Sequence, residues 1–429
     1  MVMHARTLAT TQEINISPYP KTSIDCITSI IDHPKFVSTL ANIRSDTIYT
    51  SRTGGPMVHP EIGLEIVIDS SVIKNQEQAI ATKQQILCIN KKSHSNRTII
   101  AKMNAGYFRI CMSLGAQALL WKTLCEKTIN FSPTKLPSTT FFLIWCLSLC
   151  IFVSLSILYI LRCFFHFNMV KAEFHHHIGV NYLFAPWVAW LLLLQSAPKF
   201  IFPNKYSYEY VWWPLIIPVI ALDVKIYGQW FTTEKRFLSM VANPTSQMSV
   251  IGNLVGAHAA IKMGWRESGI CLFTLGMTHY LVVFITLYQR LSGNNHIPSR
   301  LRPVFFLFVA TPSMAALAWK SINGEFDMLC KMLFFLSLFL FTSLASRPVL
   351  FKKSVKHFSV AWWAFSFPLS FLAHAAMSYA EQAKGVIPTS LALVLSSLSV
   401  LVFVFLLVCS TFKIDSLLRK PILSFSEEK

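Results

Sequence analysis

The sequence predicts an all-α integral membrane protein with ten transmembrane helices. Of its 429 residues, 53% are hydrophobic and only 14% are charged, a composition typical of membrane proteins. Apolar stretches long enough to cross a bilayer recur from Met103 onward, whereas residues 1–102 contain none. Lysine and arginine also gather on one side of those stretches, which favours an even number of spans.

The expected spans define three parts of the chain. They lie near residues 103–124, 138–162, 180–200, 210–228, 246–264, 267–291, 301–321, 326–346, 357–380 and 388–412. At 1.5 Å of rise per residue, each can cross most of a hydrocarbon core about 30 Å thick. We therefore expect a cytosolic amino-terminal tail at 1–102, a membrane domain at 103–412 and a short cytosolic carboxy-terminal tail at 413–429.

The basic residues predict the orientation of the spans. When both tails and the even-numbered connections are placed on one side, that side holds 19 Lys and Arg residues near the membrane, and the other side holds nine. Cytoplasmic loops of membrane proteins are enriched in Lys and Arg. We therefore expect both termini in the cytoplasm, and we attribute the formal charge of +18 to topology rather than to nucleic-acid binding.

Helix-breaking residues concentrate in the odd-numbered spans. Pro186, Pro312 and Pro368 fall in spans three, seven and nine, and Gly252 and Gly256 form a G-x-x-x-G pattern in span five, although span four also holds two prolines. Kinked backbone is tolerated in a membrane where it faces a cavity. The odd spans therefore either surround a central path or use these residues for close packing, because both residue types are common in transmembrane helices.

The sequence contains no complete motif for catalysis that we recognise. Three consecutive histidines, His175–His177, stand beside Glu173, but membrane di-iron enzymes draw ligands from several histidine boxes and the other histidines here stand alone. The ten cysteines include no C-x-x-C pair, and no Walker or G-x-G-x-x-G loop is present. The sequence predicts no enzyme, no metal or cofactor site and no ATP-driven transport.

Ionisable residues within the spans are scarce. Asp223 is the sole acidic candidate for a proton relay, and it lies two residues before Lys225. We expect a local ion pair between these two residues rather than a relay. His258 and His279 are interpreted as hydrogen-bonded packing residues.

Several stretches resemble one known family. They include "AGYFRI", "VNYLFAPW", "NPTSQMSVIGNLVGAHAA", "PVFFLFVATPSMAALAW" and "FSVAWWAFSFPLS", within a resemblance that runs from Ala105 to about Phe412. The chain resembles the plant slow (S-type) anion channels, which are related to bacterial tellurite-resistance and dicarboxylate-transporter proteins. Since no long tail follows Lys413, it is most similar to the short homologue subgroup.

The resemblance implies a fold and a function. The fold would be five helical hairpins in quasi-fivefold arrangement around a central pore, with the odd helices inside. The function would be passive conduction of chloride and nitrate across the plasma membrane. The implied partners are these inorganic anions, further copies of the chain as a homotrimer or related channels as a heteromer, regulatory kinases and the lipid bilayer, with no cofactor and no nucleic acid.

The resemblance also implies roles for individual residues. Phe367 corresponds to the family's pore-blocking phenylalanine, and Pro368 would kink span nine where its backbone faces the pore. We nominate Lys262 and Lys320, at the outer ends of spans five and seven, together with Arg109 as charges that attract anions; simple interfacial snorkelling of the lysines is the alternative.

Two other functions remain open. A proton-coupled organic-acid transporter would show proton-dependent flux and little channel current, and an electrically silent subunit would modulate related channels.

Gly179 stands where the guard-cell type carries an arginine, which leaves one fewer positive charge at the inner mouth and bears on conductance and selectivity.

Overall fold

A computed structural model describes residues 100–131, 138–198, 200–201, 205–232, 242–292, 299–351 and 358–413. Within these ranges every regular element is helical, which confirms the predicted all-α class. The expected tails at 1–102 and 413–429 lie almost wholly outside the described residues.

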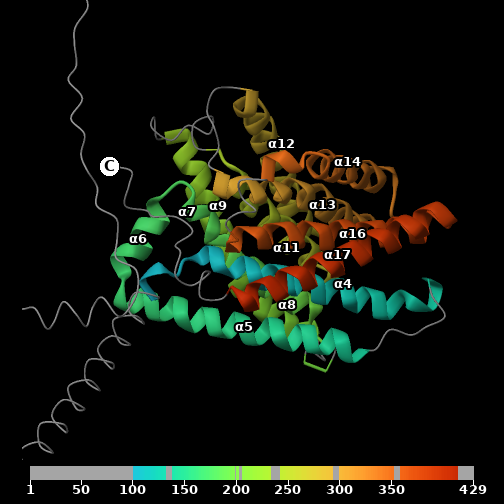
Figure 1. Ribbon diagram of the computed structural model, residues 1–429, viewed down its shortest axis with the longest axis horizontal. Helices are drawn as coiled ribbons and strands as arrows, with labels where there is room; N and C mark the ends of the chain where they lie inside the picture. Colours follow the sequence, from blue (N-terminus) through green and yellow to red (C-terminus); the bar gives the residue numbers. More distant parts are fainter. Residues whose placement is uncertain are drawn as a thin grey trace, which may run out of the picture. The chain divides into compact units, whose positions relative to one another are not determined.

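Ten helices of 13 or more residues lie in the described ranges, near the expected spans (Figure 1). They are α4 (Arg109–Phe131), α5 (Ser138–Phe165), α8 (Phe184–Ser196), α9 (Lys205–Thr232), α11 (Gln247–Lys262), α12 (Arg266–Ser292), α13 (Leu307–Asn323), α14 (Met328–Ala345), α16 (Trp363–Ala383) and α17 (Val386–Phe412). By length and hydropathy alone, seven described stretches can cross a membrane, or eight if a bent pair forms one span. The 16-residue α11 is shorter than these spans.

The bent pair lies at the predicted third span. Helix α6 (Phe167–His175) meets the stretch formed by α7 (Gly179–Tyr182) and α8 at 104°. In Figure 1, α6 leaves the end of α5 at a steep angle before the chain turns into α7. The sequence predicted only the apolar part of this unit, because α6 carries charged residues that hide it from a search for spans.

Five helices form a closed cycle of contacts, which we call the inner ring. In this cycle α4 packs against α8, α8 against α11, α11 against α13, α13 against α16, and α16 returns to α4. Short segments at the starts of these helices also contact one another in the same order. All five helices therefore begin at one end of the ring, its N-terminal end, and run in the same direction.

Four inner helices begin with a 3-10 segment: η2 (Ala105–Phe108), η4 (Pro244–Ser246), η5 (Ser299–Phe306) and η7 (Val360–Trp362). The residue before η2, η4 and η7 is extended, at Asn104, Asn243 and Ser359. The side chains of Asn104 and Asn243 accept hydrogen bonds from the backbone N–H groups of Gly106 and Thr245. Such capping satisfies donors that a helix start leaves unpaired.

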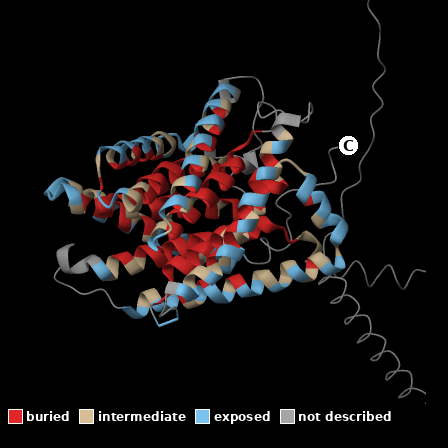
Figure 2. Ribbon diagram, turned by 180° about the vertical axis from the view of Figure 1, so that it is seen from behind, coloured by how far each residue is buried: buried red, intermediate tan, exposed pale blue. Residues whose placement is uncertain are grey.

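The other five long helices each pack on the inner helix that precedes them. These are α5 on α4, α9 on α8, α12 on α11, α14 on α13 and α17 on α16. The buried share of the apolar window is 72% in Arg302–Asn323 and 89% in Val360–Ala383, which are inner helices. In the outer helices the same share is only 22% to 39%. Figure 2 shows this contrast between a buried interior and exposed outer helices. The exposed side chains include Ile157 and Leu401, so lipid is the solvent that suits this surface.

The glycines of span five serve close packing. A Cβ atom on Gly256 would lie 2.4 Å from Cδ1 of Ile216 in α9, and one on Gly252 would lie 3.1 Å from Cγ1 of Val219. The G-x-x-x-G face therefore lets α11 approach α9. Helix α11 continues through both glycines.

The prolines occupy different kinds of position. Pro186 is the third residue of α8, within the first turn, where a missing N–H breaks no helical bond. Pro312 and Pro368 lie inside α13 and α16, and both helices continue past them.

Candidate functional site

The inner helices bring polar side chains together at the C-terminal end of the ring. Thr123 Oγ1 of α4 lies 3.3 Å from His374 Nε2 of α16, and His258 Nδ1 of α11 lies 3.0 Å from Gln195 Oε1 of α8. His258 also lies within electrostatic reach of His374 and of Lys320 in α13. Every inner helix thus contributes to one group, Thr123, Gln195, His258, Lys320 and His374, which we call the C-terminal cluster.

The C-terminal cluster identifies the central face of two helices. Helices α11 and α16 are not neighbours in the inner ring, because α13 lies between them. We therefore infer that the electrostatic interaction between His258 and His374 acts across the centre of the ring. His374 marks the central face of α16, and Thr123, which contacts it, marks that of α4.

The lysines nominated from the sequence lie at this same end. Lys262 is the last residue of α11, close to His258. Lys320 Nζ lies 3.1 Å from Glu381 Oε2, and both side chains are about one-third exposed. A third lysine, Lys122, donates to the backbone carbonyl of Ala197, just beyond the end of α8. The basic charge at this end is therefore real, although Glu381 offsets part of it.

Phe367 lies on the central face of α16. It precedes His374 by seven residues, which places the two within about 20° of each other around the helix and about 10 Å apart along it. Its side chain is 1% exposed, and its ring centre lies 5.1 Å from that of Phe371. The helical stretch runs from Val360 to Ala383, so Phe367 lies nearer its N-terminal end than its midpoint.

Arg109 lies on the central face of α4, at the N-terminal end of the ring. It precedes Thr123 by fourteen residues, which places the two within about 40° around the helix and about 21 Å apart along it. Its side chain is 2% exposed, and Nε donates to the Gly106 carbonyl at 2.9 Å. The guanidinium carbon lies 4.7 Å from the ring centre of Tyr182 in α7.

A buried ion pair joins three elements beside Arg109. Arg162 Nη1 of α5 donates to Glu173 Oε2 of α6, and the other carboxylate oxygen accepts the backbone N–H of Ala105 in η2 at 2.9 Å. Neither charged side chain is more than 1% exposed. Sequence reasoning missed this pair; the available signal was an arginine at the end of span two and one acidic residue in the connection that follows it.

The histidine triplet has a local structural role. His176 Nδ1 accepts hydrogen bonds from the backbone N–H groups of Ile178 and Gly179, at the start of α7. The His175 ring instead contacts the Lys171 carbonyl. Within the described part of the chain, no group of three metal-ligating side chains comes together.

The expected ion pair between Asp223 and Lys225 is wrong. Asp223 accepts hydrogen bonds from Ser249 Oγ and from Asn253 Nδ2, the latter at 2.7 Å, whereas Lys225 donates to the Phe174 carbonyl. Side chains two residues apart on a helix point about 160° away from each other, so they cannot face each other. Asp223 instead joins α9 to α11.

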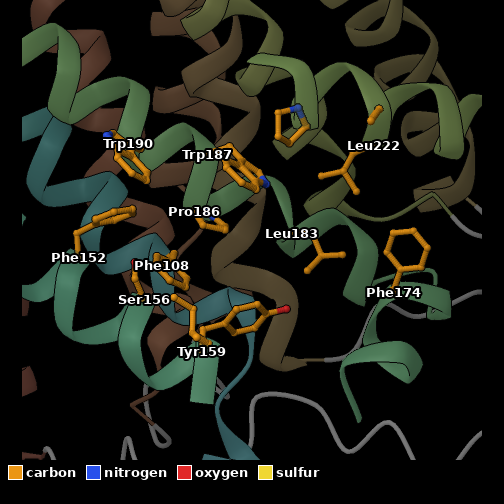
Figure 3. A pocket seen from close by; sticks show the side chains of 13 residues that line it. Phe108, Phe152, Ser156, Tyr159, Phe174, Leu183, Pro186, Trp187, Trp190 and Leu222 are labelled. Carbon is orange, nitrogen blue, oxygen red and sulfur yellow. The ribbon is translucent and has the colours of Figure 1, made fainter. Parts of the chain in front are cut away.

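A groove of about 510 Å³ lies between α5, α8 and α9. Figure 3 shows Phe152 of α5, Trp187 and Trp190 of α8 and Leu222 of α9 around it. Pro186 also lines this groove, which places it beside neighbouring outer helices. The groove is apolar, and Trp190 is 44% exposed.

Comparison with known proteins assigns the family. The sequence profile of the SLAC1 family, described as a voltage-dependent anion channel, matches residues 102–411. The S-type anion channel SLAH1 of Arabidopsis thaliana is 51% identical over 365 residues, which cover 84% of this chain and 92% of that protein. S-type anion channel SLAH4 of the same plant is 50% identical over 363 residues, 84% of this chain and 96% of that protein. A tellurite resistance protein TehA homolog of Haemophilus influenzae is 24% identical over 303 residues, 68% of this chain and 85% of that protein.

These matches confirm the resemblance inferred from the sequence, including its distant bacterial branch. The near-complete coverage of SLAH1 and SLAH4 agrees with the short homologue subgroup. They also confirm that the chain is not an enzyme. The chain belongs to the SLAC1 family of S-type anion channels.

Proposed function

We propose that this chain is a slow-type anion channel that conducts chloride and nitrate passively through the centre of the inner ring. In this proposal ten transmembrane helices form five hairpins in quasi-fivefold arrangement around the pore. The observation that supports it most strongly is the closed cycle of five parallel helices, α4, α8, α11, α13 and α16, each followed by a packed outer helix.

An anion needs such a conduit because bare hydrocarbon is prohibitive. Moving a charged group into a low-dielectric medium costs tens of kcal/mol unless dipoles or water replace its hydration. Basic groups near both ends of the ring, Arg109 at one and Lys262 and Lys320 at the other, would attract anions. Transport would then follow the membrane potential, at about 2.3 kcal/mol per charge per 100 mV.

Phe367 would act as the gate. Its ring lies on the central face between Arg109 and the C-terminal cluster, and apolar constrictions block ions by excluding water. Pro368, the next residue, has no N–H to donate to the Ala364 carbonyl one helical turn earlier in α16. Pro312 lacks the same donor in another inner helix, α13.

The remaining parts of the proposal concern the cell. We place the channel in the plasma membrane with both termini cytoplasmic, so that the N-terminal end of the inner ring faces the cytosol. Assembly as a homotrimer, or as a heteromer with related channels, and control by kinases follow from the family resemblance.

The proton-coupled alternative receives less support. It requires an acid on the transport path, and Asp223 lies on the outer helix α9, bonded to α11. A silent subunit that modulates relatives is distinguished by current recorded from this chain alone.

The test is Phe367→Ala, expressed in a cell that lacks related channels. Loss of the ring removes an apolar plug and adds no charge, so anion current per surface channel is expected to rise at least several-fold with anion preference retained. Phe403→Ala in the outer helix α17 is the matched control, because Phe403 is similarly buried and packs against Trp363 away from the centre.

Two accounts of Phe367 give different outcomes. A packing phenylalanine would cost about 3–5 kcal/mol on truncation and lower surface expression, as Phe403→Ala is expected to do. A well-expressed Phe367→Ala protein with unchanged current, measured beside a conducting relative, would end the gate assignment.

A further inference from the structure

Arg109 carries a buried charge that the described fold leaves incompletely paired. Its guanidinium is 2% exposed and bonds through Nε to the Gly106 carbonyl. Neither Nη1 nor Nη2 has a hydrogen-bond partner, and no carboxylate of the described residues pairs with it. Glu173, which accepts from the nearby Ala105 N–H, gives its other oxygen to Arg162.

A neighbouring donor is also unpaired. The Tyr182 side chain is 0% exposed, its ring centre lies 4.7 Å from the guanidinium carbon of Arg109, and its hydroxyl has no hydrogen-bond partner among the described residues. The two terminal guanidinium nitrogens of α4 and the hydroxyl of α7, all able to donate, are thus buried near one another without a hydrogen-bond partner among the described residues. An uncompensated buried charge costs several kcal/mol, and buried donors are normally satisfied.

The position of the pair is as informative as its chemistry. Arg109 lies on the central face of α4, whereas Leu114, about 140° away around the helix, belongs to a buried cluster that includes Phe403 of the outer helix α17. Counted along the helices from the contact between Thr123 and His374, Arg109 lies about 10 Å beyond Phe367 towards the N-terminal end.

We propose that Arg109 and Tyr182 form a binding site for one monovalent inorganic anion at the N-terminal end of the inner ring. The proposal rests on the proposed channel function and deepens it by naming the residues that hold the ion. Nη1, Nη2 and the Tyr182 hydroxyl would donate to it. A planar oxyanion such as nitrate matches the two parallel N–H groups of a guanidinium, whereas chloride accepts from the same donors without that match.

The test measures anion binding to the purified full chain rather than conduction. Thermal unfolding is followed while nitrate or chloride replaces gluconate at constant ionic strength, and the midpoint shift gives an apparent affinity. Binding to the folded state raises the midpoint. Arg109→Gln is expected to weaken the apparent affinity for both ions at least tenfold. In gluconate it should be no less stable than the parent, because it removes an uncompensated charge.

Further variants keep the result decisive. Arg347→Gln removes an exposed arginine after α14 and is expected to leave both affinities unchanged. If Arg109→Gln does not fold, Arg109→Lys keeps the charge without the fork and should lose several-fold more nitrate affinity than chloride affinity. Tyr182→Phe removes one donor and should weaken both ions severalfold.

Failure of the site and failure of the channel are distinguishable. A midpoint that does not depend on the anion, or a dependence that survives Arg109→Gln, or survives both Arg109→Lys and Tyr182→Phe, overturns the site whether or not the protein conducts. Anion-dependent stability that requires Arg109 in a protein that passes no current supports the site and rejects the channel function.

Discussion

Asp223 shows how a single buried polar side chain stabilises the packing of two helices. Its carboxylate accepts from Ser249 and Asn253 of α11, and Ser249 Oγ lies 3.0 Å from His279 Nδ1 of α12. The group therefore links α9, α11 and α12 through side chains that are all at most 1% exposed. Its role is to satisfy buried donors.

We expect Asp223→Leu to lower the free energy of unfolding by about 2–5 kcal/mol, because it leaves two buried donors without an acceptor. Lys225→Leu should cost under about 1 kcal/mol, since Lys225 is not the partner of Asp223. Thermal unfolding of the purified variants in detergent checks both values. Equal losses of unfolding free energy for the two variants would instead support the ion pair predicted from the sequence.

At the scale of single residues, the sequence predicted positions better than partners. Phe367 and Arg109 are buried residues whose helical positions place both on central faces, and their roles in gating and anion attraction stay predictions. The pairing of Arg162 with Glu173 was missed, because the two meet only after α6 turns back beside α5. Contacts that depend on the path of a connection leave no periodic pattern in the sequence.

At the scale of elements, the joint between α5, α6 and η2 depends on the ion pair between Arg162 and Glu173. Glu173 receives both the Arg162 guanidinium and the Ala105 N–H, so one carboxylate fixes the approach of three segments. This joint also holds the chain immediately before Arg109. Loss of the ion pair is therefore expected to disturb the start of α4 in the inner ring.

Glu173→Gln is expected to cost about 3–5 kcal/mol, because it leaves the Arg162 charge buried and unpaired. The double variant Arg162→Met, Glu173→Leu should recover a large part of that loss. Glu381→Gln is the matched control, since its pair with Lys320 is partly exposed and worth about 0–1 kcal/mol. Thermal unfolding of the four proteins decides; a double variant worse than Glu173→Gln would contradict the account.

The long helices were largely predictable, and their beginnings were not. Hydropathy predicted the outer helices because they face lipid along most of their length. The 3-10 starts η2, η4 and η7 follow extended residues whose conformation depends on local caps such as Asn104 and Asn243. An apolar average over many residues does not resolve such a feature.

At the scale of the whole molecule, the parallel direction of the inner helices requires each outer helix to return the chain to the N-terminal end. This arrangement predicts that residues on the two flanks of any outer helix lie on opposite sides of the membrane. Helix α14 offers the clearest case, with Glu325 before it and Arg347 after it, both exposed.

We expect Glu325→Cys to react with an impermeant thiol reagent applied to intact cells, and Arg347→Cys to react only after permeabilisation. The physical reason is the excess of Lys and Arg on the side of Arg347. The measurement uses a background in which exposed Cys150 and Cys271 are replaced by serine. Labelling of Arg347→Cys in intact cells would invert the proposed topology.

The parallel inner helices have one electrical consequence. Each α-helix carries a macrodipole equivalent to about half a positive charge at its beginning and half a negative charge at its end, and in this ring five such dipoles add instead of cancelling. The field along the axis is therefore polar by construction: it favours anions at the N-terminal end and opposes them at the other. Lys122, which donates to the carbonyl just beyond the end of α8, and Lys262, the last residue of α11, sit where that opposition is strongest. In the proposed channel these two lysines would offset that opposition, and neutralising them is expected to make anion current larger in one direction than in the other.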